Sequence, residues 1–314
     1  MPVSIRRPRS GFTLPEMLIV MTVFGITVGG ILTVLMRQQQ FYRGANEVLT
    51  MRAQLRQGLG AIVADLRAIS PVGGDVYALT TRAIEFRSSI GASIACRVTN
   101  TRTIVIPPTV LSNGNALTSW QSAPVATDSF FVYDDSTSSL LAGWKAYKIE
   151  SITAVTDTGG CTAATGFVQA ADQAQKSYRI QIPATATLPT TVQIGAPIRF
   201  FRRARYELYQ ATDTKWYLGY YDCVAGRMPV CNPLRPMAGP FRNFSANAEQ
   251  SGLLFSYFDQ NGAALAAAIW NAPYVARITI SLRGQTAAPV SMGGGAPALV
   301  ADSLVMDVAI RNRQ

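Results

Sequence analysis

A single carboxylate interrupts a long apolar stretch near the start of the chain. From Phe12 to Met36 nearly every side chain is apolar, and Glu16 is the one charged residue among them. A carboxylate inside a membrane segment costs roughly 2.5–3.5 kcal/mol on insertion scales, so such residues are retained mainly where they have a function. We therefore predict that Glu16 has a functional role, which a plain membrane anchor would not give it.

Other residue patterns that could support catalysis are incomplete. The chain has no histidine, which excludes Ser-His-Asp and Cys-His mechanisms. Residues 157–159 (Asp157, Thr158, Gly159) match the aspartic-protease triplet, but only one copy is present and that chemistry needs two carboxylates. Residues 259–262 resemble a calcium loop without its closing glutamate, and a tight Asn-Gly hairpin turn is the simpler interpretation. Residues 293–295 are three glycines without the lysine of a phosphate loop. We predict no enzyme activity and no cofactor.

The apolar stretch predicts a helix that begins in a membrane. A 25-residue helix reaches about 37 Å, enough to cross a hydrocarbon core of ~30 Å. Arg6, Arg7 and Arg9 precede it and the next basic residue is Arg37, which predicts a cytoplasmic N-terminus. Beyond Met36 the apolar residues recur mostly at three-, four- and seven-residue steps, which indicates an amphipathic continuation to about residue 70. A secretory signal would have a shorter core and an Ala-x-Ala-like cleavage site.

The remaining chain has the texture of a β-rich domain. Period-two alternation and turn residues predict strands over residues 81–88, 93–98, 102–106, 129–133, 144–149, 177–182, 198–209, 215–221, 253–258, 274–282 and 304–310. Residues 198–209 and 215–221 are expected to pair around a turn at 211–214. A mobile Gly/Pro/Ala loop is expected over 285–297. The fold class is therefore α+β, with a long N-terminal helix packed on a strand-rich head.

Four cysteines in a chain whose head lies outside the cytoplasm predict disulfide bonds. Cys223 and Cys231 are close in sequence around turn-forming residues, so we favour a Cys223–Cys231 bridge and, by remainder, Cys96–Cys161. The alternative is that the cysteines are free or buried thiols. Zinc is not expected, because the chain lacks both histidine and a Cys-x-x-Cys pair. We predict no metal site.

The densest basic and aromatic segment lies in one predicted strand. It contains four basic and four aromatic residues: Arg199, Arg202, Arg203 and Arg205, and Phe200, Phe201, Tyr206 and Tyr209. The net charge of +10 permits contact with DNA but does not require it. Two interpretations stay open: a DNA-contacting strand, or a strand with a solvated basic face and aromatic residues in the core.

The N-terminal motif resembles the signal of type IV pilin-like proteins. It combines a basic leader, Gly11, Phe12, Glu16 and the apolar run. The resemblance implies that a prepilin peptidase cuts after Gly11 and methylates the new N-terminus at Phe12. It also implies that Glu16 of one subunit lies near the N-terminal amine of its neighbour in a filament, so that pairing offsets the cost of burying the charge. Pro15, where many family members carry an aliphatic residue, falls in the first helical turn and is tolerated there.

The expected domains are a leader (1–11), a transmembrane and filament-core helix (12–36), its amphipathic continuation (37–70) and a β-rich head (71–314). The large head and the closing strands resemble PilW/GspJ-type minor pilins and pseudopilins. The implied function is a minor pilin that helps to initiate assembly near the pilus tip. Its partners are the peptidase, other major and minor pilins, and the inner membrane before assembly; its final place is a surface pilus (fimbrium). The alternatives are a type II secretion pseudopilin in the periplasm and a DNA-binding pilus component for natural transformation.

Overall fold

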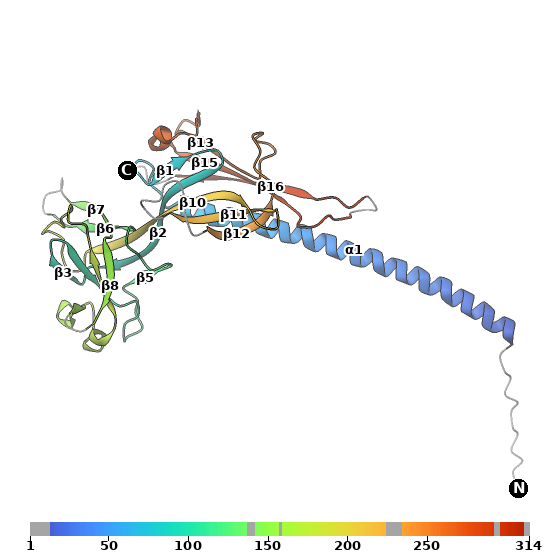
Figure 1. The fold of residues 1–314 in the computed structure, drawn as a ribbon, viewed down its shortest axis with the longest axis horizontal. Coiled ribbons are helices and arrows are strands. Elements are labelled where there is room, and N and C mark those ends of the chain that lie inside the picture. Colours follow the sequence, from blue (N-terminus) through green and yellow to red (C-terminus); the bar gives the residue numbers. More distant parts are fainter. Residues whose placement is uncertain (1–12, 137–141, 157–158, 224–233, 292–295, 311–314) are drawn as a thin grey trace, which may run out of the picture.

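The computed structural model describes residues 13–136, 142–156, 159–223, 234–291 and 296–310. One long helix, α1 (Leu14–Leu66), projects far beyond a strand-rich head (Figure 1). At 1.5 Å per residue its 53 residues span about 80 Å. The predicted α+β fold class is confirmed.

α1 ends four residues before the expected end at residue 70. Pro71 disfavours a helical conformation at Ser70, and the Ser70 N–H donates to Asp75 Oδ2 at 2.8 Å instead of continuing the helix. The amide of Ala68 already bonds to the Asp65 carbonyl, three residues back. Ile69 is nevertheless buried, so the chain leaves the helix without leaving the core. The predicted start at Phe12 lies outside the described residues.

The head contains two antiparallel sheets. The larger sheet has the order β1-β2-β10-β11-β12-β15-β13-β14, with β5 and β6 added beside β2 and β10, β7 beside β6, and β16 beside β15. The smaller sheet has the order β3-β4-β9-β8. The strands are β1 (Val76–Leu79), β2 (Ala83–Ile94), β3 (Arg97–Asn100), β4 (Thr103–Ile106), β5 (Ser119–Trp120), β6 (Ser129–Asp134), β7 (Gly143–Lys148), β8 (Ser151–Val155), β9 (Ser177–Gln181), β10 (Pro197–Gln210), β11 (Trp216–Cys223), β12 (Leu234–Phe241), β13 (Leu253–Phe258), β14 (Ala264–Leu265), β15 (Arg277–Gln285) and β16 (Ala301–Ala309).

Two strands run through the two larger hydrophobic cores of the head. The first core packs the buried stripe of α1 against the larger sheet and includes Ala204, Tyr206 and Leu208 of β10. The second core lies toward the smaller sheet and includes Ile198 and Phe200 of the same strand. β2 runs beside β10 in continuous register through both regions, apart from one bulge. The head therefore has two lobes joined by the β2–β10 ribbon (Figure 1).

The strand predictions are largely confirmed, with a few shifted boundaries. Strands β10 and β11 pair around residues 211–214 as expected. The predicted strand over 93–98 is divided, because β2 continues to Ile94 and β3 begins only at Arg97. The predicted strand over 274–282 starts at Arg277, since a 3-10 helix, Ile269–Tyr274, precedes it. Strands β1, β5, β8, β12 and β14 were not predicted. Strand β12 contains a proline at 236 and another at 240, and proline normally argues against a strand interior.

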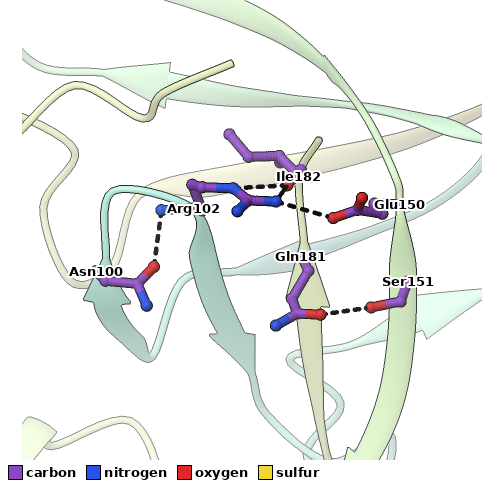
Figure 2. A network of polar contacts seen from close by, with 6 residues as sticks. All are labelled: Asn100, Arg102, Glu150, Ser151, Gln181 and Ile182. Atoms are coloured by element: carbon purple, nitrogen blue, oxygen red, sulfur yellow. Dashed lines mark hydrogen bonds and ion pairs between the residues drawn. The ribbon is translucent and has the colours of Figure 1, made fainter. Parts of the chain in front are cut away.

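The second lobe is held together by a disulfide and a polar network. Cys96 and Cys161 are bonded, with 5.5 Å between their Cα atoms, so this predicted pairing is confirmed. In the turn between β3 and β4, Arg102 donates to the Ile182 carbonyl and to Glu150 (Figure 2). The Arg102 and Glu150 side chains are both exposed, so their ion pair adds little stability. The network positions the edge of the small sheet rather than forming a binding site.

Candidate functional site

The N-terminal half of α1 is an apolar rod that the head does not cover. Its most apolar stretch is long enough to cross a membrane, with a mean hydropathy of 2.4 and no buried residue. The apolar side chains from Leu14 to Met36 are exposed apart from the half-buried Val28, and the first buried residue of the helix is Gly44. An uncovered apolar surface of this size must be buried by lipid or by another protein. Together with the motif upstream, it supports membrane anchoring before assembly.

Three of the four polar side chains between Leu14 and Met36 have partners within the helix itself. Thr22, Thr27 and Thr33 donate their hydroxyl groups to carbonyls three or four residues earlier, each at 2.8 Å. Such bonds satisfy a hydroxyl in a solvent that offers no hydrogen bonds. Among the residues that the structure describes, Glu16 has no hydrogen bond or ion pair. Of these four polar groups, the carboxylate is the most expensive to bury, and it is the one without a partner in the described part of the chain.

Helix electrostatics explain only part of why Glu16 is tolerated. Pro15 occupies the first turn, and Glu16 is the acidic residue of that turn. A carboxylate there gains about 0.3–1 kcal/mol from the helix dipole, well below the 2.5–3.5 kcal/mol cost of the charge in a membrane. Gly11, Phe12 and the three leader arginines lie outside the described residues, so the cleavage site has no described geometry.

The second half of α1 packs against the head through one stripe of apolar side chains. Leu55, Leu59, Ile62 and Leu66 are buried at three- and four-residue steps, as the sequence predicted, and Met51 is buried one turn earlier. Phe41, which the same spacing placed on this stripe, is exposed. Polar contacts flank this stripe: Gln57 donates to the Met237 carbonyl, Gln54 accepts from the Gly239 amide, and Arg52 pairs with Asp302. The head therefore packs against the helix from residue 44 onward and leaves the preceding turns exposed.

Two glycines of α1 allow the head to approach the helix closely. A Cβ atom at Gly44 would lie 2.5 Å from Val290 Cγ1, and one at Gly58 would lie 3.1 Å from Leu282 Cδ2. A Cβ at Gly60 would meet nothing within 4 Å. Glycine weakens a helix by up to about 1 kcal/mol relative to alanine, and at Gly44 and Gly58 the absence of a side chain makes room for the head.

Arg202 is a buried structural residue rather than a surface cation. It is 6% exposed and forms a two-pronged ion pair with Asp128, with Nε–Oδ1 at 2.9 Å and Nη2–Oδ2 at 2.8 Å. It also donates to the Ser122 hydroxyl and the Ala123 carbonyl. On β10 it lies between Phe200 of the second core and Ala204 of the first, so it fills the junction of the two lobes.

The other three arginines of β10 lie on the opposite, outer face. Arg203 pairs with Glu85 and Arg205 pairs with Glu207. Arg199 is exposed, and its guanidinium carbon lies 4.7 Å from the centroid of the Trp144 ring. Because three of the four guanidinium groups are matched by carboxylates, the segment does not present the concentrated positive charge that phosphate binding requires. The structure thus favours the interpretation as a strand with basic and core-facing sides.

The remaining candidate motifs add no chemistry to the described residues. Residues 259–263 form a turn between β13 and β14, in which Asp259 Oδ1 accepts from the amides of Asn261 and Ala263. Residues 157, 158 and 293–295 lie outside the described residues. Cys231 also lies outside them, so the predicted Cys223–Cys231 bridge stays a prediction. Across the described part of the chain, no three Asp, Glu, Cys or His residues gather as a metal site.

The sequence did not predict two features around these sites. The first is the partner of Arg202, because nothing in the sequence distinguishes Asp128 from a turn residue. The burial of Arg202 itself had a signal, since this residue falls on the same alternation as Phe200 and Ala204. The contact of Val290 with Gly44 depends on the path of a loop, which local sequence does not specify.

Comparison with known families gives one match. The prokaryotic N-terminal methylation motif matches residues 6–32, a segment that includes Gly11, Phe12 and Glu16. Neither the curated proteins nor the solved structures gave a match to the chain.

Proposed function

We propose that this type IV pilin-like protein is a minor pilin of a type IV pilus and that it helps to initiate assembly near the tip. A prepilin peptidase cleaves after Gly11 and methylates the amine of Phe12. Before assembly the protein spans the inner membrane once, with its N-terminus in the cytoplasm and its head outside. After assembly it lies in the pilus on the cell surface.

Assembly proceeds by lateral packing of the uncovered half of α1 against the helices of other pilins. The observation that carries this proposal is the contrast within that half: Thr22, Thr27 and Thr33 are satisfied by their own helix, and Glu16 has no partner among the described residues. A neighbouring subunit supplies the partner as its cationic N-terminal amine. Pairing then offsets the desolvation cost that a lone carboxylate would bear in the filament core.

The size of the head supports a minor rather than a major component. Major pilins usually have smaller heads, whereas this head has two large hydrophobic cores joined by long strands. A large head at every position of a filament would crowd its neighbours, while one at or near the tip is free on its distal side.

A pseudopilin of a type II secretion system has the same architecture, and a capture experiment separates the two. The full chain, tagged at its C-terminus and cross-linked in its native cells, should co-purify with pilins of a surface pilus. Recovery of secretion components with no pilus subunits would replace the proposal with the pseudopilin assignment.

A further inference from the structure

The long hairpin that connects β15 and β16 lies along α1 on the side toward its apolar half (Figure 1). Residues 286–291 and 296–301 are called here the arm. Two pairs hold its two sides together: the Thr286 amide bonds to the Val300 carbonyl at 2.9 Å, and Val290 and Ala298 exchange both backbone hydrogen bonds. The sequence predicted a mobile loop here, but its described parts form a paired extension of the sheet.

The arm is anchored to the helix at two points. Val290 is 5% exposed and packs over Gly44, where the missing side chain makes room for it. Three residues further along the helix, Glu47 Oε2 accepts a hydrogen bond from the Ala287 amide at 3.2 Å. These contacts fix the height of the arm along the helix axis.

The two anchors lie just beyond the expected surface of the membrane, because Gly44 and Glu47 follow Met36 by about 12 Å and about 16 Å along the helix. The apolar run ends at Met36, and Phe41 follows about 7–8 Å further along the helix. The headgroup layer on each side of a hydrocarbon core is about 5–8 Å thick, so Phe41 and its neighbour Tyr42 fall at its level. Both are 66% exposed, and aromatic residues are enriched at membrane surfaces. Ser291 of the arm and Phe41 line the same cavity, of about 270 Å³.

The composition of the arm suits a lipid interface. The whole connection from Thr286 to Ala301 has no charged residue, and Leu299 is 52% exposed. Beside it, Arg43 is exposed on the helix and lines a second, larger cavity of about 460 Å³ under the arm. Glu47 lines the same cavity, where its carboxylate accepts the hydrogen bond from the Ala287 amide. A cation next to an uncharged, partly apolar surface is the combination that binds anionic headgroups while contacting the acyl boundary.

We propose that the arm is a second membrane contact, which rests on the headgroups of the leaflet from which α1 emerges and sets the head at a fixed height and tilt before assembly. The occupant of the surface is anionic lipid, because the surface is continuous with the membrane-spanning part of the helix. The inference rests on membrane anchoring of α1 and is independent of the choice between pilus and secretion system.

The test measures the distance of the arm from lipid. The full mature chain is reconstituted in vesicles of equimolar phosphatidylcholine and phosphatidylglycerol, in which a fraction of the lipids carry a headgroup quencher. Ala298→Cys is labelled with a fluorophore, and Ala170→Cys is the matched control because it is also exposed but lies in the second lobe. The chain without an added cysteine reports any labelling of native cysteines.

We expect quenching to remove most of the fluorescence at position 298 and almost none at position 170. Equal, weak quenching at both positions would overturn the proposal. The substitution Gly44→Val displaces the arm from the helix, so unchanged quenching at position 298 in that variant would also overturn it. Hydrogen exchange of the unsubstituted chain gives an independent reading. Amides of the arm should exchange more slowly in these vesicles than in vesicles of phosphatidylcholine alone, and equal exchange would again contradict a contact with anionic lipid. The results of these two lipid measurements are independent of the co-purification experiment that tests the proposed function.

Discussion

Arg202 of β10 and Asp128, 74 positions earlier, form a buried two-pronged ion pair at the junction of the two lobes. Apolar side chains of strand β10 join the second core before Arg202 and the first core after it. The ion pair therefore lies at the point where apolar packing along the strand is interrupted. Its four hydrogen bonds satisfy most of the guanidinium donors. We infer that the pair determines how the lobes join.

Removing one member of the pair should destabilise the head strongly. Asp128→Ala leaves the Arg202 charge buried without its partner, and such losses cost about 3–5 kcal/mol. The measurement is denaturant unfolding of the full chain in detergent, compared with Arg199→Ala on the exposed face of the same strand. A loss no larger than that of the Arg199 control would show that the junction does not depend on the pair.

A second prediction concerns acid stability at Asp172. Burial opposes ionisation of this carboxyl, but hydrogen bonds from the amides of Gln169 and Ser112 outweigh it and lower the pKa. The folded chain therefore binds this proton less tightly than the unfolded chain does. The ionised group stabilises the fold above the unfolded pKa near 3.8, and this stability is lost as the pH falls through the lower, folded pKa.

Asp172→Asn should accordingly be less stable than the parent at neutral pH, and the difference should shrink as the pH falls below 3.8. Thermal unfolding of both proteins across that range provides the measurement. A difference that stays constant with pH would assign the effect to lost geometry rather than to charge.

The two glycines at 44 and 60 form a matched pair for the helix–arm contact. Gly44→Ala forces a Cβ against Val290 and should destabilise the packing by about 1–3 kcal/mol. Gly60→Ala meets open space and should stabilise the helix by about 0.5–1 kcal/mol. Unfolding of the full chain in detergent gives both values. Stabilisation by both substitutions would mean that the arm yields without cost.

The sequence alone predicted the features that depend on local periodicity. The three- and four-residue spacing from Leu55 to Leu66 predicted the buried stripe of α1, and the alternation of residues 198–209 predicted β10 and its pairing with β11. Contacts between distant segments could not be obtained this way. The partner of Arg202, the place of Val290 over Gly44 and the division of the head into two lobes each depend on how separate strands meet in space.

At the candidate site the sequence was informative because the chemistry is local. A carboxylate five residues after Gly11 within an apolar run is visible without any fold. The structure adds that the threonines of the same run are satisfied internally, which leaves Glu16 as the group that needs a partner.

Glu16→Ala should still insert in the membrane but should enter filaments poorly. Insertion does not suffer, because the substitution removes a charge from an apolar helix. Incorporation should drop severely, because the neighbour's amine loses its buried counter-charge. Immunoblots of membranes and of sheared filaments measure the two quantities. Thr22→Ala is the control, since that hydroxyl is bonded within its own helix; equal incorporation of both variants would exclude the pairing role.

N-terminal mass spectrometry of the protein isolated from its own cells tests the central claim most directly. The account predicts a mature chain that begins at residue 12 with a methylated Phe12. A chain that still begins at Met1 or Pro2, or one that is trimmed beyond the apolar run, would contradict it and leave a tethered β-rich head that does not assemble by this route.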